Sequence, residues 1–131
     1  MHKRLVTRYA MKSAEAADEN QRRVEGVFAE LDETKPDSVS YIVLRLADDS
    51  FLHVSFHNHT DDEVNPIAST AAFAHFQDGH GERREGGVDQ KTATLVGAYI
   101  TTRWLSGMPK ALRTRSRISG ASSDWRMSLR G

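Results

Sequence analysis

The apolar residues between positions 17 and 31 recur at the spacing of one helix face, and this stripe constrains the fold more than any other feature of the chain. Its members are Ala17, Val24, Val27, Phe28 and Leu31, with Asn20 and Gly26 near the same face. Spacings of three and four residues are typical of an amphipathic helix that covers a core. Ser13 can cap its start, and Pro36 disfavours a helical conformation in the preceding residue. We therefore predict a helix from Ser13 to Thr34.

Strand patterns lie on both sides of this helix. Residues 5–9 form a β-branched and aromatic run before it. Residues 39–46 and 51–57 follow it, and the polar break at 47–50 between them has the length of a hairpin turn. In the second of these strands apolar and polar residues alternate, which places Phe51, His53, Ser55 and His57 on one face.

The remaining patterns complete the order of elements. Asn65-Pro66 has the form of a helix start, with an Asn cap and Pro at the first helical position, and the apolar surface of that helix extends to Phe76. The glycine-rich residues 79–87 indicate a flexible connection, and residues 92–101 indicate a fourth strand. The order strand, helix, strand, strand, helix, strand predicts an α+β, ferredoxin-like sandwich with an antiparallel sheet and both helices on one face.

Two strands carry apolar residues at both parities, which is unusual for a sheet with one solvated face. They are Tyr41-Ile42-Val43-Leu44 and Leu95-Val96-Gly97-Ala98-Tyr99-Ile100. Apolar side chains at both parities indicate a strand that is buried on both faces of the sheet. Because the chain has no second sheet to supply the cover, we predict a homodimer in which another copy packs against the open face.

Length and composition are those of one globular domain. The chain has 131 residues, of which 38% are hydrophobic and 27% charged, and it contains no cysteine. The lack of cysteine removes thiolate catalysis, disulfides and cysteine metal sites. No apolar run approaches the ~20 residues that span a bilayer, and no signal-peptide core follows the N-terminus, so we expect a cytoplasmic protein without membrane contact.

The charges divide the chain into two parts. Residues 1–102 hold 11 Lys and Arg against 17 Asp and Glu, whereas residues 103–131 hold 7 against 1. We interpret 1–102 as the domain and 103–131 as a basic, Arg- and Ser-rich tail that is flexible. Such a tail can touch nucleic acid, but a loose attraction to the acidic domain is the simpler interpretation.

Taken together, several short motifs resemble the dimeric α+β barrel superfamily, in particular small antibiotic biosynthesis monooxygenase-like proteins that are common in actinobacteria. The resemblance spans residues 5–100 and rests on Asp18-Glu19-Asn20, Val27-Phe28-Ala29-Glu30-Leu31, Tyr41, Phe51, His53-Val54, Asn65-Pro66, Phe73, Phe76, Glu82-Arg83, Val96-Gly97 and Tyr99. It implies fold and dimerisation more than reaction, because one fold carries many sites. Residues 84–87 depart from the pattern, where a proline-containing segment is expected.

The resemblance implies a cofactor-independent oxygenase of phenolic small molecules as one function. Such an enzyme needs a pocket between sheet and helices, with polar groups that orient a small aromatic substrate and stabilise negative charge. The candidate catalytic residues are Asn20, His53 and Arg83, and the candidate substrate-binding residues are Tyr41, Phe73 and Phe76. The alternative function is a non-catalytic dimer that binds a ligand or acts in a stress response.

Each candidate residue also has a structural interpretation. Asn20 can bond the backbone, Tyr41 can belong to the core, and His53 can be a cross-strand partner. Arg83 can pair with Glu82 or Glu85, and Phe73 and Phe76 have the spacing of ordinary core residues.

The other histidines offer weaker alternatives. His53 and His57 would lie about 13 Å apart on a strand, too far to share a metal, whereas His57 and His59 could bind one together with Asp61 or Asp62. His75 or His80 could serve as an axial haem ligand on the second helix. We expect no metal and no cofactor, with haem as the alternative.

Overall fold

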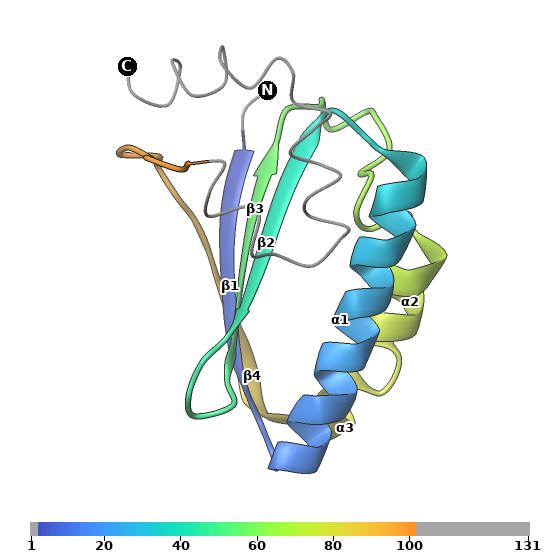
Figure 1. Cartoon of the computed structure of the whole chain (residues 1–131), viewed down its shortest axis with the longest axis vertical. Coiled ribbons are helices and arrows are strands. Elements are labelled where there is room, and N and C mark those ends of the chain that lie inside the picture. Colours follow the sequence, from blue (N-terminus) through green and yellow to red (C-terminus); the bar gives the residue numbers. More distant parts are fainter. Residues whose placement is uncertain (1–2, 102–131) are drawn as a thin grey trace.

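The computed structural model describes residues 3–101, which form four strands and three helices (Figure 1). The elements are β1 (Lys3–Met11), α1 (Ala14–Thr34), β2 (Val39–Arg45), β3 (Phe51–His57), α2 (Ala71–Gln77), α3 (His80–Arg83) and β4 (Arg84–Thr92). The basic tail predicted at 103–131 lies outside the described residues. None of the helices in the described range is long and apolar enough to cross a membrane.

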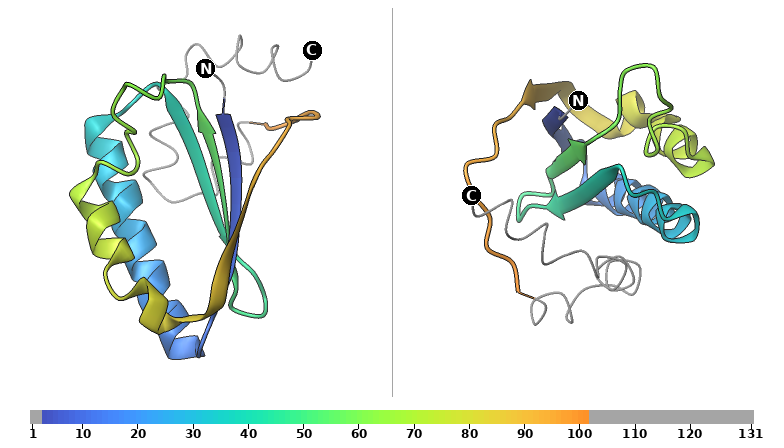
Figure 2. Two further views of the ribbon diagram at one scale, coloured as in Figure 1. Left: turned by 180° about the vertical axis from the view of Figure 1, so that it is seen from behind. Right: turned by 90° about the horizontal axis from the view of Figure 1, so that it is seen from above.

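The strands form one antiparallel sheet in the order β2-β3-β1-β4. Figures 1 and 2 show the helices on one face of this sheet, and among residues 3–101 no helix lies on the other. The predicted α+β, ferredoxin-like arrangement is therefore confirmed, including the order of its strands and helices along the chain.

The long helix α1 matches its prediction closely. Ser13 is the N-cap, and its Oγ accepts a hydrogen bond from the Ala16 N–H at 3.0 Å. The helix ends where Lys35 adopts a left-handed conformation, just before Pro36. Its buried residues are Ala17, Asn20, Val24, Val27 and Leu31, which follow the predicted stripe. Phe28 of that stripe is only partly buried, and the polar Asn20 is fully buried.

The second helix, α2, begins later than the Asn65-Pro66 pattern predicts. Asn65 does cap a turn, since its Oδ1 accepts from the N–H groups of Ile67 and Ala68, but the chain leaves this turn before α2 begins. Thr70 is the N-cap of α2, and its Oγ1 accepts from Phe73 N–H at 3.0 Å. Glu30 of α1 adds a second cap by accepting from the first two N–H groups of α2. This tertiary contact fixes where α2 starts, and sequence patterns near residue 65 do not contain it.

The fourth strand lies earlier in the chain than the sequence pattern predicts. Residues 84–92, predicted to lie largely in a flexible connection, form β4, while residues 93–101 have no regular structure. Strand β4 pairs with β1 through residues 84–85 and 89–92, and the register is irregular between Arg8 and Ala10, where β4 carries the extra residues 86–88. Gly86 lies there with a φ of 77°, which favours glycine. Hydrogen bonding to the edge of β1 outweighs the low strand propensity of this segment.

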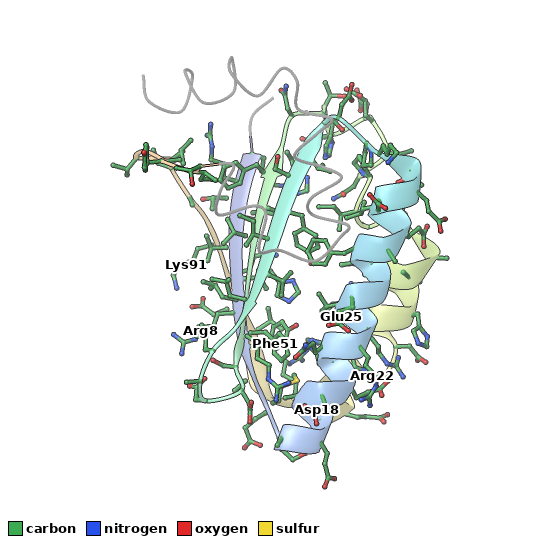
Figure 3. The ribbon with its side chains drawn as sticks, in the orientation of Figure 1. Arg8, Asp18, Arg22, Glu25, Phe51 and Lys91 are labelled. Carbon is green, nitrogen blue, oxygen red and sulfur yellow. The ribbon has the colours of Figure 1, made fainter. Side chains whose placement is uncertain are left out.

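The register assigns each strand residue to one side of the sheet. Tyr9 pairs with Phe51 and Tyr41 pairs with Ser55, so these residues share the face covered by the helices. In Figure 3 Phe51 points toward α1, whereas Arg8 and Lys91 project from the opposite side. The core between sheet and helices contains Tyr9, Ala17, Val24, Val27, Leu31, Val39, Phe51, Ile67 and Phe76.

The opposite face of the sheet is apolar at its centre. Ile42 and Leu44 of β2 are 38% and 47% exposed. Leu52, Val54 and Phe56 of β3 share their side, since β2 and β3 pair in register. No helix covers this face within the described residues (Figure 2).

Candidate functional site

A chain of hydrogen bonds between side chains crosses the core from α1 to β2. The Asn20 Nδ2 donates to the Tyr9 hydroxyl at 2.9 Å, and this hydroxyl lies 2.7 Å from the His53 Nε2. The other ring nitrogen of His53, Nδ1, lies 2.7 Å from the hydroxyl of Tyr41. Four polar side chains from four elements thus form one continuous network, and Asn20 and His53 are buried within it.

The strand register explains why the two tyrosines meet the histidine. His53 pairs directly with Thr7 of β1 and with Val43 of β2. Tyr9 and Tyr41 are each two residues away from those partners and are therefore its diagonal neighbours on the same face, which is within reach of a long side chain. Asn20 reaches Tyr9 from α1, because it belongs to the buried stripe that this helix turns toward the sheet.

Arg83 joins this network from α3. Its Nη2 donates to the Asn20 Oδ1 at 3.3 Å and to the Phe76 carbonyl at 2.7 Å, and its Nη1 donates to the Asp78 carbonyl at 2.7 Å. A guanidinium can only donate, so this contact orients the Asn20 amide with its oxygen toward Arg83 and its NH₂ toward Tyr9. Arg83 therefore fixes the end of α2 and the direction of the Asn20 hydrogen bonds together.

His80 packs against the same tyrosine. Its ring centroid lies 4.5 Å from that of Tyr9, nearly perpendicular to it, and 4.9 Å from that of Phe76. Its Nδ1 lies 2.7 Å from the Arg84 Nη1, which can only donate, so the ring proton resides on Nε2. That Nε2 and the Arg83 Nε are buried without a hydrogen-bond partner among residues 3–101. The network thus borders on two unpaired buried donors.

Burial keeps the histidines and tyrosines of this cluster uncharged near neutral pH. It lowers the pKa of His53 to about 4, with a smaller contribution from His80. It raises the pKa of Tyr9 to about 12 against the opposing effect of the Asn20 hydrogen bond, and it raises the pKa of Tyr41 as well. For His80, burial and the charges of Arg84 and Arg83 lower the pKa to about 4. A neutral histidine between two protonated phenols can pass a proton by changing tautomer without becoming a cation.

Aromatic rings form the walls around these polar groups. Phe76 lies 5.7 Å from the His53 ring, and Phe73 lies 5.6 Å from Phe76, measured between centroids. On the other side Phe28 stacks on Tyr41 at 5.1 Å. The surroundings of the network are therefore apolar and aromatic.

The structure brings together the residues that were singled out from the sequence. Asn20, Tyr41, His53 and Arg83 are linked through hydrogen bonds, and Phe76 contacts His53 while Phe73 packs behind it. Their roles in any reaction remain predictions. Arg83 forms its hydrogen bonds with carbonyls and Asn20 rather than with Glu82 or Glu85.

Sequence reasoning missed two members of the cluster. The sequence pattern predicts only a strand at Tyr9, although Tyr9 is the link between Asn20 and His53. A buried tyrosine usually needs a partner for its hydroxyl, and that expectation could have pointed to it. For His80 the sequence suggests only a haem ligand, because its glycine-rich surroundings do not predict the helix α3 that presents it.

Among the described residues, the structure supports neither a metal site nor a haem site at the histidines. Within residues 3–101 no three His, Cys, Asp or Glu side chains are placed to hold one metal ion. For haem, His75 is exposed on α2, and the His80 ring is in contact with the rings of Tyr9 and Phe76. A porphyrin beside His80 would have to displace these rings, so the residues do not fit the group.

Comparison with solved structures identifies the class of fold. The chain is similar to a candidate antibiotic biosynthesis monooxygenase from Nitrosomonas europaea, with a TM-score of 0.56 and 11% identity over 70% of this chain and 88% of the other. It is similar to Rv0793 from Mycobacterium tuberculosis, with a TM-score of 0.57 and 12% identity over 75% and 98%. A candidate antibiotic biosynthesis monooxygenase from Caulobacter crescentus gives 0.57 and 14% over 70% and 87%.

These likenesses show that the chain has the fold of the antibiotic biosynthesis monooxygenase-like proteins. The resemblance predicted from the sequence is confirmed at this level. No protein-family model and no curated protein matches the chain.

Proposed function

We propose that this protein is a cofactor-independent oxygenase of phenolic small molecules. The observation that carries the proposal is the hydrogen-bonded chain from Arg83 through Asn20, Tyr9 and His53 to Tyr41. Its donors are fixed in a site that is poor in water, where they stabilise negative charge more strongly than they would in solution. The fold shared with antibiotic biosynthesis monooxygenase-like proteins supports the same class of reaction by analogy.

In the proposed reaction the substrate itself reduces oxygen. A phenol and O₂ give a quinone and water, so that one oxygen atom enters the ring and the other leaves as water. The substrate hydroxyl binds beside Tyr41, whose own hydroxyl is held by the His53 Nδ1. The proton that the substrate hydroxyl loses leaves in the water that forms from O₂. Asn20 and the unpaired donors of Arg83 and His80 stabilise the phenolate and the reduced oxygen formed from it. Phe73 and Phe76 bind the substrate ring.

The active form in this proposal is a homodimer. Ile42 and Leu44 leave an apolar face open on the sheet, and a second copy with the same face would bury it. Residues 93–101 run along that side of the molecule, away from the helices (Figures 1 and 2). Within this segment Val96 is 97% and Tyr99 79% exposed, so it too has apolar surface to bury.

One observation favours a second candidate function, a non-catalytic dimer that binds a ligand. Both ring nitrogens of His53 are already bonded to tyrosines, and its low pKa makes it a weak base. In that case the network shapes a binding site for a phenol and no turnover follows.

Oxygen consumption distinguishes the two. The purified chain is mixed with a panel of mono- and polycyclic phenols while oxygen uptake, quinone formation and ligand binding are recorded. We expect one O₂ per quinone formed. Removing the Tyr41 hydroxyl with Tyr41→Phe, or the amide with Asn20→Ala, should lower the rate by about 10²-fold, as for other preorganised donors.

His75→Gln is the matched control, because His75 is an exposed histidine on α2. Saturable phenol binding without oxygen uptake would support the ligand-binding function instead. Neither binding nor uptake across the panel would contradict both.

A further inference from the structure

A second set of polar side chains continues along β3 beyond the network of His53. The Ser55 Oγ lies 2.9 Å from the His57 Nε2, and the His57 Nδ1 lies 3.0 Å from the His59 Nε2. The His59 Nδ1 in turn lies 3.1 Å from the carbonyl oxygen of Thr60. Three side chains at alternate positions thus form a line that ends on a backbone carbonyl.

The carbonyl decides the direction of every hydrogen bond in this line. A carbonyl only accepts, so the proton of His59 is on Nδ1, and in the neutral ring its Nε2 is an acceptor. The His57 Nδ1 must then carry the proton and donate to it. This leaves the lone pair of the His57 Nε2 directed at Ser55, whose hydroxyl donates the remaining hydrogen bond.

We propose that Ser55 is a nucleophile activated by His57, with His59 as a positioning residue, and that the site hydrolyses small carboxylic esters. Serine, a histidine base and a third group that orients the base form the general arrangement of a nucleophilic hydrolase, and it is recognised by geometry rather than by sequence order. None of the three residues belongs to the proposed oxygenase network, so the two proposals stand independently.

The reaction proceeds in two balanced steps. The Ser55 Oγ attacks the ester carbonyl and forms a bond to its carbon while the hydroxyl proton moves to the His57 Nε2. The tetrahedral intermediate then breaks the ester carbon–oxygen bond, and the proton on His57 passes to the departing alkoxide, which leaves as an alcohol and an acyl group on Ser55. Water next attacks the acyl group with the same base. The carboxylic acid leaves, and the Ser55 hydroxyl is restored.

The surroundings of His57 favour its unprotonated form, which is the form that can act as a base at neutral pH. His57 is 6% exposed, and burial lowers its pKa below the ordinary value, with smaller effects from His59 and Lys3. Ser55 is partly buried, and its Oγ, which contacts the His57 Nε2, is the atom that a reagent has to reach. Leu5 and Tyr41 pair with Ser55 on the neighbouring strands and limit the space beside it. The site therefore suits a short acyl chain.

Covalent labelling tests the proposal. The full chain is treated with a fluorophosphonate and, separately, with p-nitrophenyl acetate, and the modified residue is located by peptide mass mapping. We expect a single adduct on Ser55, which Ser55→Ala abolishes. His57→Gln should slow acylation by about 10²–10⁴-fold, the usual contribution of a general base.

Two further comparisons separate positioning from mere structure. His59→Ala should slow acylation, whereas His59→Gln should restore it, because the amide oxygen can accept from the His57 Nδ1. Ser40→Ala is the matched control, since Ser40 is exposed on the opposite face of the sheet. Circular dichroism checks the fold of each variant.

Three outcomes would overturn the proposal. These are an adduct on a histidine, unchanged labelling of a folded Ser55→Ala variant, and equal rates for His59→Ala and His59→Gln. Should the buried His57→Gln variant fail to fold, the Ser55 and His59 variants still decide.

Discussion

At the scale of single residues, the neutral state of His53 links the site to the stability of the fold. Burial keeps its pKa near 4, whereas a histidine in an unfolded chain titrates near 6.5. Between these two values the unfolded state binds more protons than the folded state does. The free energy of unfolding must therefore rise with pH across this range, reaching its full value above pH 6.5.

We predict that the protein loses stability between pH 6.5 and pH 4 because His53 has to be protonated there. Lowering the pH from 6.5 to 4 should remove on the order of 3 kcal/mol through His53 alone, from the size of its pKa shift. His57 and His80, whose pKa values are also lowered, add to the slope. Urea unfolding at several pH values measures how the free energy of unfolding depends on pH. The His53→Gln variant should show a shallower pH dependence, and an unchanged slope would mean that His53 is not buried as a neutral ring.

Residue patterns predicted the members of the site better than their connections. Asn20 and His53 are candidates because the resemblance implies polar groups between sheet and helices, and the predicted helix and strand place these two residues there. Tyr9 was not identifiable in the same way. Its importance depends on the register between β1 and β3, which places it diagonal to His53, and a sequence does not state which strands pair.

At the scale of elements, the contrast between α1 and β4 shows what local patterns contain. Helix α1 has its cap, its stripe and its stop signal within its own residues, and all were predictable. Strand β4 contains Gly86, Gly87 and several charges, and it is a strand because β1 offers an edge for pairing. Conversely, residues 95–100 have strand composition but no strand beside them among residues 3–101.

Glycine conformation gives a prediction for β4. Gly86 has a φ of 77°, in the left-handed region, whereas the φ of its neighbour Gly87 lies outside that region. A Cβ added to either glycine would meet no atom within 4 Å. Gly86→Ala should therefore destabilise the fold by about 1–2 kcal/mol through backbone strain alone. Gly87→Ala should be within about 0.5 kcal/mol of the native chain or more stable. Equal unfolding midpoints in urea for the two variants would contradict the irregular β1–β4 pairing.

At the scale of the whole molecule, the apolar sheet face predicts the state of assembly. We expect the native chain to sediment as a dimer at micromolar concentration. Leu44→Asp should shift it to monomer, because a charge at the centre of a buried interface would lose its water without gaining a partner. Leu44 is 47% exposed in the single chain, so the variant should still fold.

Gln77→Asp is the matched control for this experiment. It adds the same charge at an exposed position on α2, on the helix side of the molecule. The prediction is wrong if the native chain is a monomer, or if both variants dissociate equally.

The alternation of β3 also has a consequence for how such a chain can change by insertion or deletion. His53, Ser55 and His57 face the helices, while Leu52, Val54 and Phe56 face away from them. Because side chains alternate with a period of two, lengthening the turn at 46–50 by one residue and shifting β3 accordingly would exchange the two sets. The histidines would then lie on the outside and the apolar trio in the core. The length of this hairpin therefore determines which side chains lie on each face of β3. We expect insertions or deletions there to be tolerated only when they change the length by two residues, or when the loop accommodates them without a shift of the strand.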